Sequence, residues 1–217
     1  MKKKTLYVII GGPQASGKSV AKKHLEETYE NIVIFPESAQ TILNNYRKKG
    51  IILGGALANI DFQKRILESD LERMKRIHKS REVVYVDESN LFTVAHVKVK
   101  NSKLADLFLA KYMQTLESFE VGIIFTDIAP DVSWKRRKQV YMKRYEGTPN
   151  FKDNMKHSKE YIFQLYPHLI ELYDALPYPK QKIDGTVTFD DFKQSVESAF
   201  EKIYEEVDIE KNLFKNN

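Results

Sequence analysis

Nine residues near the start of the chain combine glycines, a lysine and a serine in a spacing that suits phosphate binding. The segment GGPQASGKS places Gly12, Gly17, Lys18 and Ser19 in the pattern G-x-x-x-x-G-K-[ST]. The two glycines allow successive backbone N–H groups to converge on phosphate oxygens, because no Cβ stands in the way. A helix beginning near Lys18 would direct the positive end of its dipole at the same anion. We therefore expect a nucleotide-phosphate site here.

The spacing is that of a P-loop (Walker A), and it assigns a role to two side chains. Lys18 is expected to reach the β- and γ-phosphates of ATP, and the Ser19 hydroxyl to ligate Mg²⁺. An apolar run precedes the pattern and a helical one follows it, which is the context that a P-loop requires. The predicted nucleotide-binding residues are Gly12, Pro13, Gln14, Ala15, Ser16, Gly17, Lys18, Ser19 and Val20.

Acidic side chains follow two further apolar runs of the chain. Glu37 comes after NIVIF, and Asp87 with Glu88 comes after EVVYV. A carboxylate at the end of such a strand can hold the metal ion or accept a proton from an attacking hydroxyl. The competing interpretation is an acidic residue that caps the next helix. We favour a catalytic role for Glu37 and Asp87, and we expect Asp87 also to bind the metal ion.

A strongly basic segment, WKRRKQVYMKRYEG, follows the fourth apolar run. On a helix Arg137 and Arg144 share one face, as do Arg136 and Lys143, since each pair is seven residues apart. These cations can clamp the transferring phosphoryl group, and residues 136–157 are then the lid that expels water. Two alternatives stay open, a solvated helix and a polynucleotide groove, because the segment mixes an aromatic side chain with cations.

The elements that position these residues follow from hydrophobic patterning. Short apolar runs rich in Val and Ile occur at 6–10, 31–35, 82–86, 120–126 and, more weakly, 180–183. Longer helical patterns separate them, among them one over 57–77. Alternating strands and helices predict a parallel sheet with helices on both faces. Ligands of such sheets bind at the carboxyl ends of the strands, where the candidate residues lie.

Composition narrows the class of protein further. The chain has 217 residues, no cysteine and a formal charge of +5, which favours an anionic partner. We expect one domain over 1–210 with a tail at 211–217, a reducing cytoplasm and no membrane span. The five histidines show no spacing typical of metal ligands, so surface or internally paired histidines are the better interpretation.

Several motifs, in order, resemble the P-loop nucleoside kinases. They are GGPQASGKS, PES after the second strand, DFQ in the long helix, DES after the third strand, and the arginine-bearing helix. The deoxyribonucleoside kinases are the most similar, with the nicotinamide riboside kinase type beside them. The resemblance implies a three-layer α/β/α P-loop NTPase fold, with a five-stranded parallel sheet and a helical lid.

The resemblance also implies roles for single residues. Glu37 would be the base for the acceptor hydroxyl, Gln63 would contact the nucleobase, and Asp87 would support Mg²⁺. Asp184, in the turn after the last strand, would lie near the adenine. One departure concerns Glu88, which stands where the family usually has arginine, so we place it among the substrate-binding residues and expect altered acceptor contacts.

These features together predict an ATP- and Mg²⁺-dependent phosphotransferase that acts on a hydroxyl of a nucleoside-like small molecule. The alternatives are a nucleoside monophosphate kinase, a P-loop ATPase or GTPase, and a polynucleotide 5′-hydroxyl kinase. The ATPase alternative rests on VVYVDE, which resembles a Walker B motif whose glutamate activates water. Nucleic acid is the less favoured partner, and a homodimer is left open.

Overall fold

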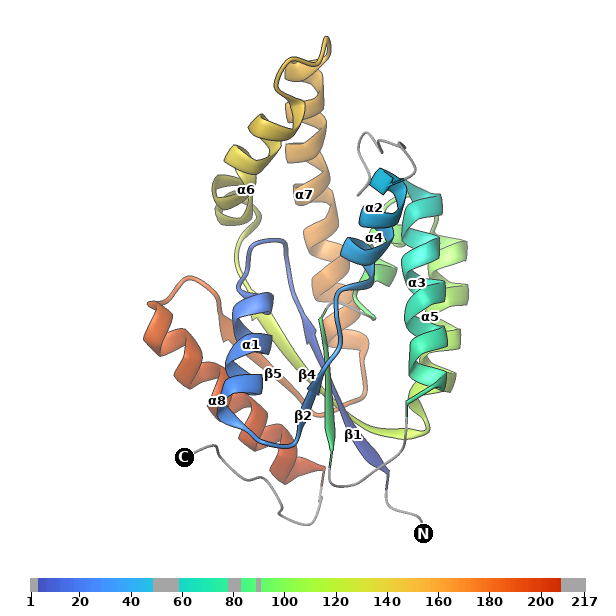
Figure 1. Cartoon of the computed structure of the whole chain (residues 1–217), viewed down its shortest axis with the longest axis vertical. Helices are drawn as coiled ribbons and strands as arrows, with labels where there is room; N and C mark the ends of the chain where they lie inside the picture. The colour runs from blue at the N-terminus through green and yellow to red at the C-terminus, as the bar shows by residue number, and fades with distance from the viewer. Residues whose placement is uncertain (1–3, 49–58, 78–82, 89–90, 208–217) are drawn as a thin grey trace.

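The computed structural model describes residues 4–48, 59–77, 83–88 and 91–207, and these residues form a five-stranded parallel sheet covered by helices (Figure 1). The strand order is β2-β3-β1-β4-β5. The strands are β1 (Thr5–Gly11), β2 (Ile32–Ile34), β3 (Val84–Glu88), β4 (Phe119–Asp127) and β5 (Lys180–Asp184). The predicted fold class is confirmed.

All five predicted strands are present, and only the third is displaced. β3 begins and ends two residues later than the predicted run at 82–86, so Asp87 and Glu88 are its last two residues instead of following it. In a strand, successive side chains point to opposite faces of the sheet. The side chains of Asp87 and Glu88 therefore lie on opposite faces of the sheet, whereas the sequence analysis expected both to follow the strand at the same site.

The helices form two layers around the sheet. Buried side chains of α1 and α8 pack on one face, and those of α3, α4, α5 and α7 pack on the other. The helices of the described residues are α1 (Lys18–Thr28), α2 (Ser38–Lys48), α3 (Ile60–Lys75), α4 (Thr93–Lys98), α5 (Ser102–Leu116), α6 (Pro130–Tyr145), α7 (Phe151–Ala175) and α8 (Phe189–Glu206). Of the predicted helix at 57–77, the described part is α3, and Leu57 lies outside the described residues.

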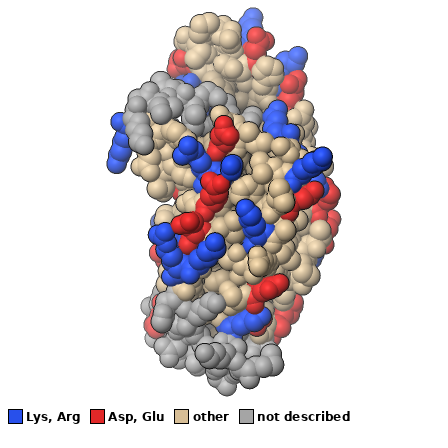
Figure 2. Space-filling model, turned by 90° about the vertical axis from the view of Figure 1, so that its right-hand side faces the viewer, with Lys and Arg blue, Asp and Glu red and all other residues tan. Residues whose placement is uncertain are grey.

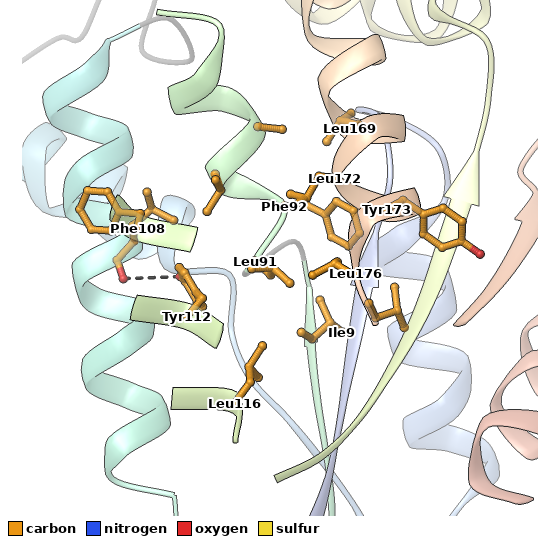
Figure 3. Close-up of a cluster of buried hydrophobic side chains, with 14 of the residues drawn as sticks. Ile9, Leu91, Phe92, Phe108, Tyr112, Leu116, Leu169, Leu172, Tyr173 and Leu176 are labelled. Atoms are coloured by element: carbon orange, nitrogen blue, oxygen red, sulfur yellow. Dashed lines mark hydrogen bonds between the residues drawn. The ribbon is translucent and has the colours of Figure 1, made fainter. Parts of the chain in front are cut away.

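The larger core lies between the sheet and the helices of the second layer (Figure 3). Side chains from α5 and α7 converge there on Ile9 of β1 and on Phe92, which precedes α4. Phe92 also packs so closely over Gly11 that a Cβ at Gly11 would lie 2.2 Å from its ring. The end of β1, from which the P-loop begins, is thus fixed by the core itself.

Helices α6 and α7 form a hairpin that rises beyond the edge of the sheet where the strands end (Figure 1). The segment predicted as a lid, 136–157, covers most of α6, the connecting turn and the start of α7. The predicted tail at 211–217 lies outside the described residues, and the single-domain boundary stays a prediction.

Charges of both signs are mixed on the face of the molecule that Figure 2 shows. Among the described residues, no helix combines the length and the apolarity needed to cross a bilayer.

Candidate functional site

The loop between β1 and α1 has a backbone that only glycine can adopt at two points. Gly12 and Gly17 have φ angles of 134° and 104°, in the left-handed region. A Cβ at Gly12 would also lie 2.1 Å from the carbonyl oxygen of Thr126. Gly17 precedes the first residue of α1, so the N–H groups of the first helical turn are exposed at the loop. This is the geometry expected of an anion-binding loop.

Polar bonds fix the loop to the sheet. The Ser16 hydroxyl donates to the carbonyl oxygen of Pro13 at 2.9 Å and pairs with the Thr126 hydroxyl of β4 at 2.5 Å. The Thr126 hydroxyl in turn reaches the Gly11 carbonyl oxygen at 3.1 Å. Ser16 is only 1% exposed, so these bonds are shielded from water and hold the loop in place. They involve only hydroxyl groups and carbonyl oxygens, and they therefore leave the N–H groups of the loop for a ligand.

Lys18 lies inside this loop. Its Nζ donates to the carbonyl oxygens of Gly12 and Pro13, at 3.1 and 2.7 Å. Burial lowers the pKa of Lys18, while the negative charges of Glu88 and Glu37 raise it. A polyphosphate bound at the loop would favour the ammonium form in the same way, so the charge of Lys18 suits an anionic ligand.

Ser19 and Glu88 form an oxygen-rich pair at the mouth of the loop. The Ser19 hydroxyl donates to both carboxylate oxygens of Glu88, at 3.0 and 3.1 Å, and the Lys22 ammonium lies 3.1 Å from Oε2. Hydroxyl and carboxylate oxygens are the donors that Mg²⁺ prefers. The side chains present therefore fit a magnesium ion at Ser19, with Glu88 as the neighbouring carboxylate.

Asp87 occupies a different position from the one that the sequence predicted. It is 1% exposed and faces the opposite side of the sheet, where it accepts hydrogen bonds from the Tyr7 hydroxyl at 2.6 Å and from the Arg73 guanidinium. The reason is the alternation along β3: Glu88 faces α1, and Asp87 faces α3 and α5. We therefore transfer the expected metal-side role from Asp87 to Glu88.

A cleft of about 460 Å³ extends from the P-loop to a pocket between the helices. Glu37, the residue before α2, lies on its wall. Burial within the site, followed by the charge of Glu88, raises the pKa of Glu37 above its ordinary value. The lining residues are Gly12, Gln14, Ala15, Gly17, Lys18, Ser19, Val20, Glu37, Ala39, Phe62, Gln63, Ile66, Glu88, Phe92, Thr93, His96, Arg137 and Leu169.

The first turn of α3 forms one wall of the cleft. The Asn59 side chain caps this helix by accepting from the Phe62 N–H at 3.0 Å, as helix-capping asparagines do. The cap fixes Phe62 and Gln63 at the cleft, where both are almost fully buried. The structure thus brings Gln63 together with Glu37 and the P-loop, while its contact with a nucleobase stays a prediction.

His96 is a cleft residue that the sequence interpretation missed. Its Nδ1 lies 2.8 Å from the hydroxyl of Tyr161 on α7. Burial, together with the positive charge of Lys18, lowers the pKa of His96 to about 4, so the ring is neutral at pH 7. The spacing of four residues places His96 on the same side of α4 as Phe92, and this spacing was the sequence signal for its position. The histidines lack the spacing of metal ligands, so the sequence interpretation did not assign His96 to a site.

The three arginines of the predicted lid occupy three different positions. Arg137 lines the cleft. Arg136 donates to the carbonyl oxygens of Ala15 and Gly185, at 3.0 and 2.9 Å, and so braces the P-loop against the turn after β5. Arg144 is exposed, with its guanidinium 5.5 Å from the ring centre of Tyr141.

Helix α6 is fastened directly to the P-loop. The Ser133 hydroxyl donates to the Gln14 carbonyl oxygen at 2.7 Å, and the Tyr141 hydroxyl donates to Gln14 Oε1 at 2.8 Å. Gln14 is therefore held by its backbone and by its side chain. A displacement of Gln14 would therefore also displace or break its bonds to α6.

Asp184 ends β5 and shapes the turn that follows it. Its carboxylate accepts from the N–H and the hydroxyl of Thr186, at 2.7 and 2.6 Å, and these bonds lower its pKa. The next residue, Gly185, lies so close to the P-loop that a Cβ there would be 2.5 Å from the Ser16 carbonyl oxygen. The turn is thus adjacent to the P-loop, and the contact of Asp184 with adenine stays a prediction.

Comparison with known proteins agrees with this geometry. A family model described as an AAA domain matches residues 7–188. Two solved structures of deoxyadenosine kinase from M. mycoides, one with bound dATP and one with bound dCTP, are similar in fold, each with a TM-score of 0.57. The first is 14% identical over 90% of this chain and 98% of its own, and the second is 16% identical over 92% and 99%. No curated protein sequence matches the chain.

Proposed function

The chain belongs to the AAA-domain family of P-loop proteins, and on this premise we propose that it transfers the γ-phosphoryl group of ATP to a hydroxyl of a nucleoside-like small molecule. One observation carries the proposal: a single cleft is lined by Lys18 of the P-loop together with Glu37 and Gln63. A triphosphate on the loop would point its last phosphate toward the part of the cleft that contains the carboxylate. The volume of about 460 Å³ is typical of small-molecule sites.

The proposed division of roles follows the positions of the side chains. The loop N–H groups and Lys18 neutralise the phosphates, and Arg137 stabilises the charge that spreads over the transferring group. Glu37 accepts the proton of the acceptor hydroxyl, since a raised pKa brings a carboxylate nearer to the working range of a general base. Gln63 offers an amide that donates and accepts at once, which suits the edge of a base.

Ser19 and Glu88 would hold Mg²⁺. The ion supplies charge neutralisation on the phosphate oxygens when it is bound. The Ser19–Glu88 pair orients its oxygen atoms at the mouth of the loop before any ligand arrives. Lys22, which contacts the same carboxylate, limits the rotation of Glu88.

The two similar structures are consistent with this proposal. Each is a deoxyadenosine kinase with a bound deoxynucleoside triphosphate. At 14–16% identity the similarity shows a common fold alone. The proposal of a nucleoside acceptor is therefore based on the residues that line the cleft of this chain. ATP hydrolysis is the main rival, because Glu88 ends a buried strand, in a motif that resembles a Walker B sequence with a water-activating glutamate. Its bonds to Ser19 and Lys22 favour the metal-side role.

An acceptor screen tests the proposal. ADP release would be followed with Mg²⁺-ATP and, in turn, nucleosides, nucleoside monophosphates, nicotinamide riboside, 5′-hydroxyl oligonucleotides and no acceptor. We expect turnover with a nucleoside-like molecule and at most about one-hundredth of that rate without an acceptor, since water is then excluded or misplaced. Lys18→Ala, prepared in parallel, controls for contaminating kinases.

Two results would contradict the proposal. ADP release at the same rate with and without acceptors would indicate a hydrolase. Release only with oligonucleotides, weakening steeply as salt rises, would indicate a polynucleotide kinase. Turnover restricted to nucleoside monophosphates would retain phosphoryl transfer and change the acceptor class.

A further inference from the structure

A cluster of buried polar side chains lies behind the cleft and joins five elements of the fold. It contains two carboxylates, Asp70 and Asp87, which are 2% and 1% exposed, and a single guanidinium, Arg73, which contacts both. Ionised groups are costly to bury without a partner of opposite charge. The other members are Tyr7 of β1, Ser38 of α2 and Tyr112 of α5.

The Arg73 guanidinium reaches two separate segments of the chain. On one side, its NH1 group donates to the Pro36 carbonyl oxygen at 3.0 Å and to the Ser38 hydroxyl at 2.9 Å. On the other side, its NH2 group donates to Asp87, and to Asp70 of its own helix at 2.9 Å. The aromatic ring of Phe35 lies 4.9 Å from the guanidinium carbon and packs against it.

Both segments carry a carboxylate of the cleft. Glu37 lies between Pro36 and Ser38, and Glu88 follows Asp87 directly. Arg73 therefore holds the backbone carbonyl before Glu37, the side chain of the residue after Glu37 and the side chain of the residue before Glu88. Arg73 does not line the cleft, so it acts on these carboxylates through their neighbours.

Resting on the proposed function, we propose that Arg73 is a positioning residue that fixes Glu37 and Glu88 relative to each other. Arginine suits this task because its planar fork makes several hydrogen bonds in fixed directions. Lysine keeps the charge but presents a single ammonium on a flexible chain, so it cannot hold both segments in the same way. A displacement of about 1 Å in a reacting group can cost about 100-fold in rate.

The test compares Arg73→Lys with Arg76→Met. Arg76 directly follows the same helix as its C-cap, is exposed and pairs only with Glu72 among the described residues, so its substitution removes a cation without touching the cluster. Three quantities would be measured: kcat, KM for ATP, and the ratio of ATP affinities with Mg²⁺ and with EDTA. The affinity ratio reports on Ser19 and Glu88 without requiring turnover.

We expect Arg73→Lys to lower kcat by about tenfold or more and to leave KM for ATP within about twofold, since the P-loop is intact. The Mg²⁺ enhancement of ATP binding should fall by about threefold or more, while binding in EDTA stays unchanged. Arg76→Met should match the unsubstituted protein in all three. A folded Arg73→Lys protein that also matches it would overturn the proposal.

A second variant protects the test from misfolding. Ser38→Ala removes one small side chain on the Glu37 side, with its hydrogen bonds to Arg73 and Asp70, and keeps both partners of each Arg73 ion pair. It should lower kcat and leave the Mg²⁺ enhancement within about twofold, because the Glu88 side is untouched. Unchanged kcat in Ser38→Ala contradicts the positioning role even if Arg73→Lys does not fold.

The outcome also separates this inference from the proposed function. If no acceptor is phosphorylated while the Mg²⁺ enhancement still depends on Arg73, the function is wrong and the effect on Glu88 stands. If transfer is observed and Arg73→Lys is normal, the function stands and the positioning role is wrong.

Discussion

The electrostatic environment of Glu37 should determine how the reaction rate depends on pH. Burial, and after it the charge of Glu88, raises the pKa of Glu37 above the ordinary value. A base must be deprotonated to work, so kcat/KM should fall as pH is lowered through this raised pKa. The acid limb is expected at higher pH than for an ordinary glutamate.

Glu88→Gln tests the cause of that shift. Removing the neighbouring charge lowers the pKa of Glu37, so the acid limb of kcat/KM should move to lower pH even though the maximal rate falls. A pH–rate series on both proteins measures it. An acid limb that stays in place would show that Glu88 does not act on the base, and Glu37→Gln should abolish the limb altogether.

His96 lines the cleft and is expected to act as a neutral hydrogen-bonding group for the acceptor. With a pKa of about 4 it does not titrate near neutrality. His96→Phe should raise KM for the acceptor by about tenfold, the value of roughly one hydrogen bond, with little change in KM for ATP. The matched control is His157→Phe, at an exposed position of α7 away from the cleft. Equal KM values in the two variants would exclude His96 from acceptor binding.

At the scale of the elements, the lid arginines separate in a way that sequence periodicity does not reveal. The spacing of seven correctly places Arg137 and Arg144 near one helical face. Both guanidiniums lie near the ring of Tyr141, but Arg144 is about two turns farther along α6 and is exposed. Only Arg137 of the three lines the cleft in the described structure.

Arg137→Ala should therefore lower kcat by at least about 100-fold, as removal of one charge-stabilising donor does. Arg144→Ala should change kcat by less than about threefold, since exposed substitutions have small effects. Steady-state kinetics on the two variants measures the difference. Equal losses would mean that the lid closes farther on its ligands and that both arginines act, as the sequence pattern alone suggests.

The helices and strands also differ in how well the sequence could predict them. The parallel sheet followed from the Val- and Ile-rich runs, because strands buried on both faces are apolar along their whole length. The P-loop followed from its glycines. The end of β3 did not, since Asp87 and Glu88 are polar residues inside the strand, held there by Tyr7 and Arg73 on one face and by Ser19 and Lys22 on the other.

Other features of the site depend on contacts between distant parts of the chain. Arg73 and Asp87 are fourteen residues apart, yet nothing in local periodicity indicates that they pair. Tyr161 approaches His96 from another helix, sixty-five residues away. The first pair joins α3 to β3 and the second joins α4 to α7, so both depend on tertiary packing that local sequence patterns do not specify.

For the whole molecule, the P-loop is the point at which the layers meet. It contacts β4 through Thr126, the lid through Ser133 and Arg136, and α8 through Phe192, whose ring would lie 2.7 Å from a Cβ at Gly17. A ligand that binds this loop therefore stabilises contacts with the sheet, with α6 and with α8. Nucleotide binding should raise the melting temperature of the molecule as one unit.

At a ligand concentration of about 100 Kd, binding adds roughly 2.7 kcal/mol to the free energy of unfolding. For a chain of this length that corresponds to a rise in Tm of about 5–10 °C, measurable by calorimetry with Mg²⁺-ATP. Mg²⁺-ADP should also raise Tm, whereas AMP at the same concentration should not, because it lacks the β-phosphate that the loop and Lys18 are expected to hold. Lys18→Ala should reduce the shift with ATP. An equal shift with AMP would locate binding at the nucleoside instead of the polyphosphate, and the roles assigned to the loop would then have to be abandoned.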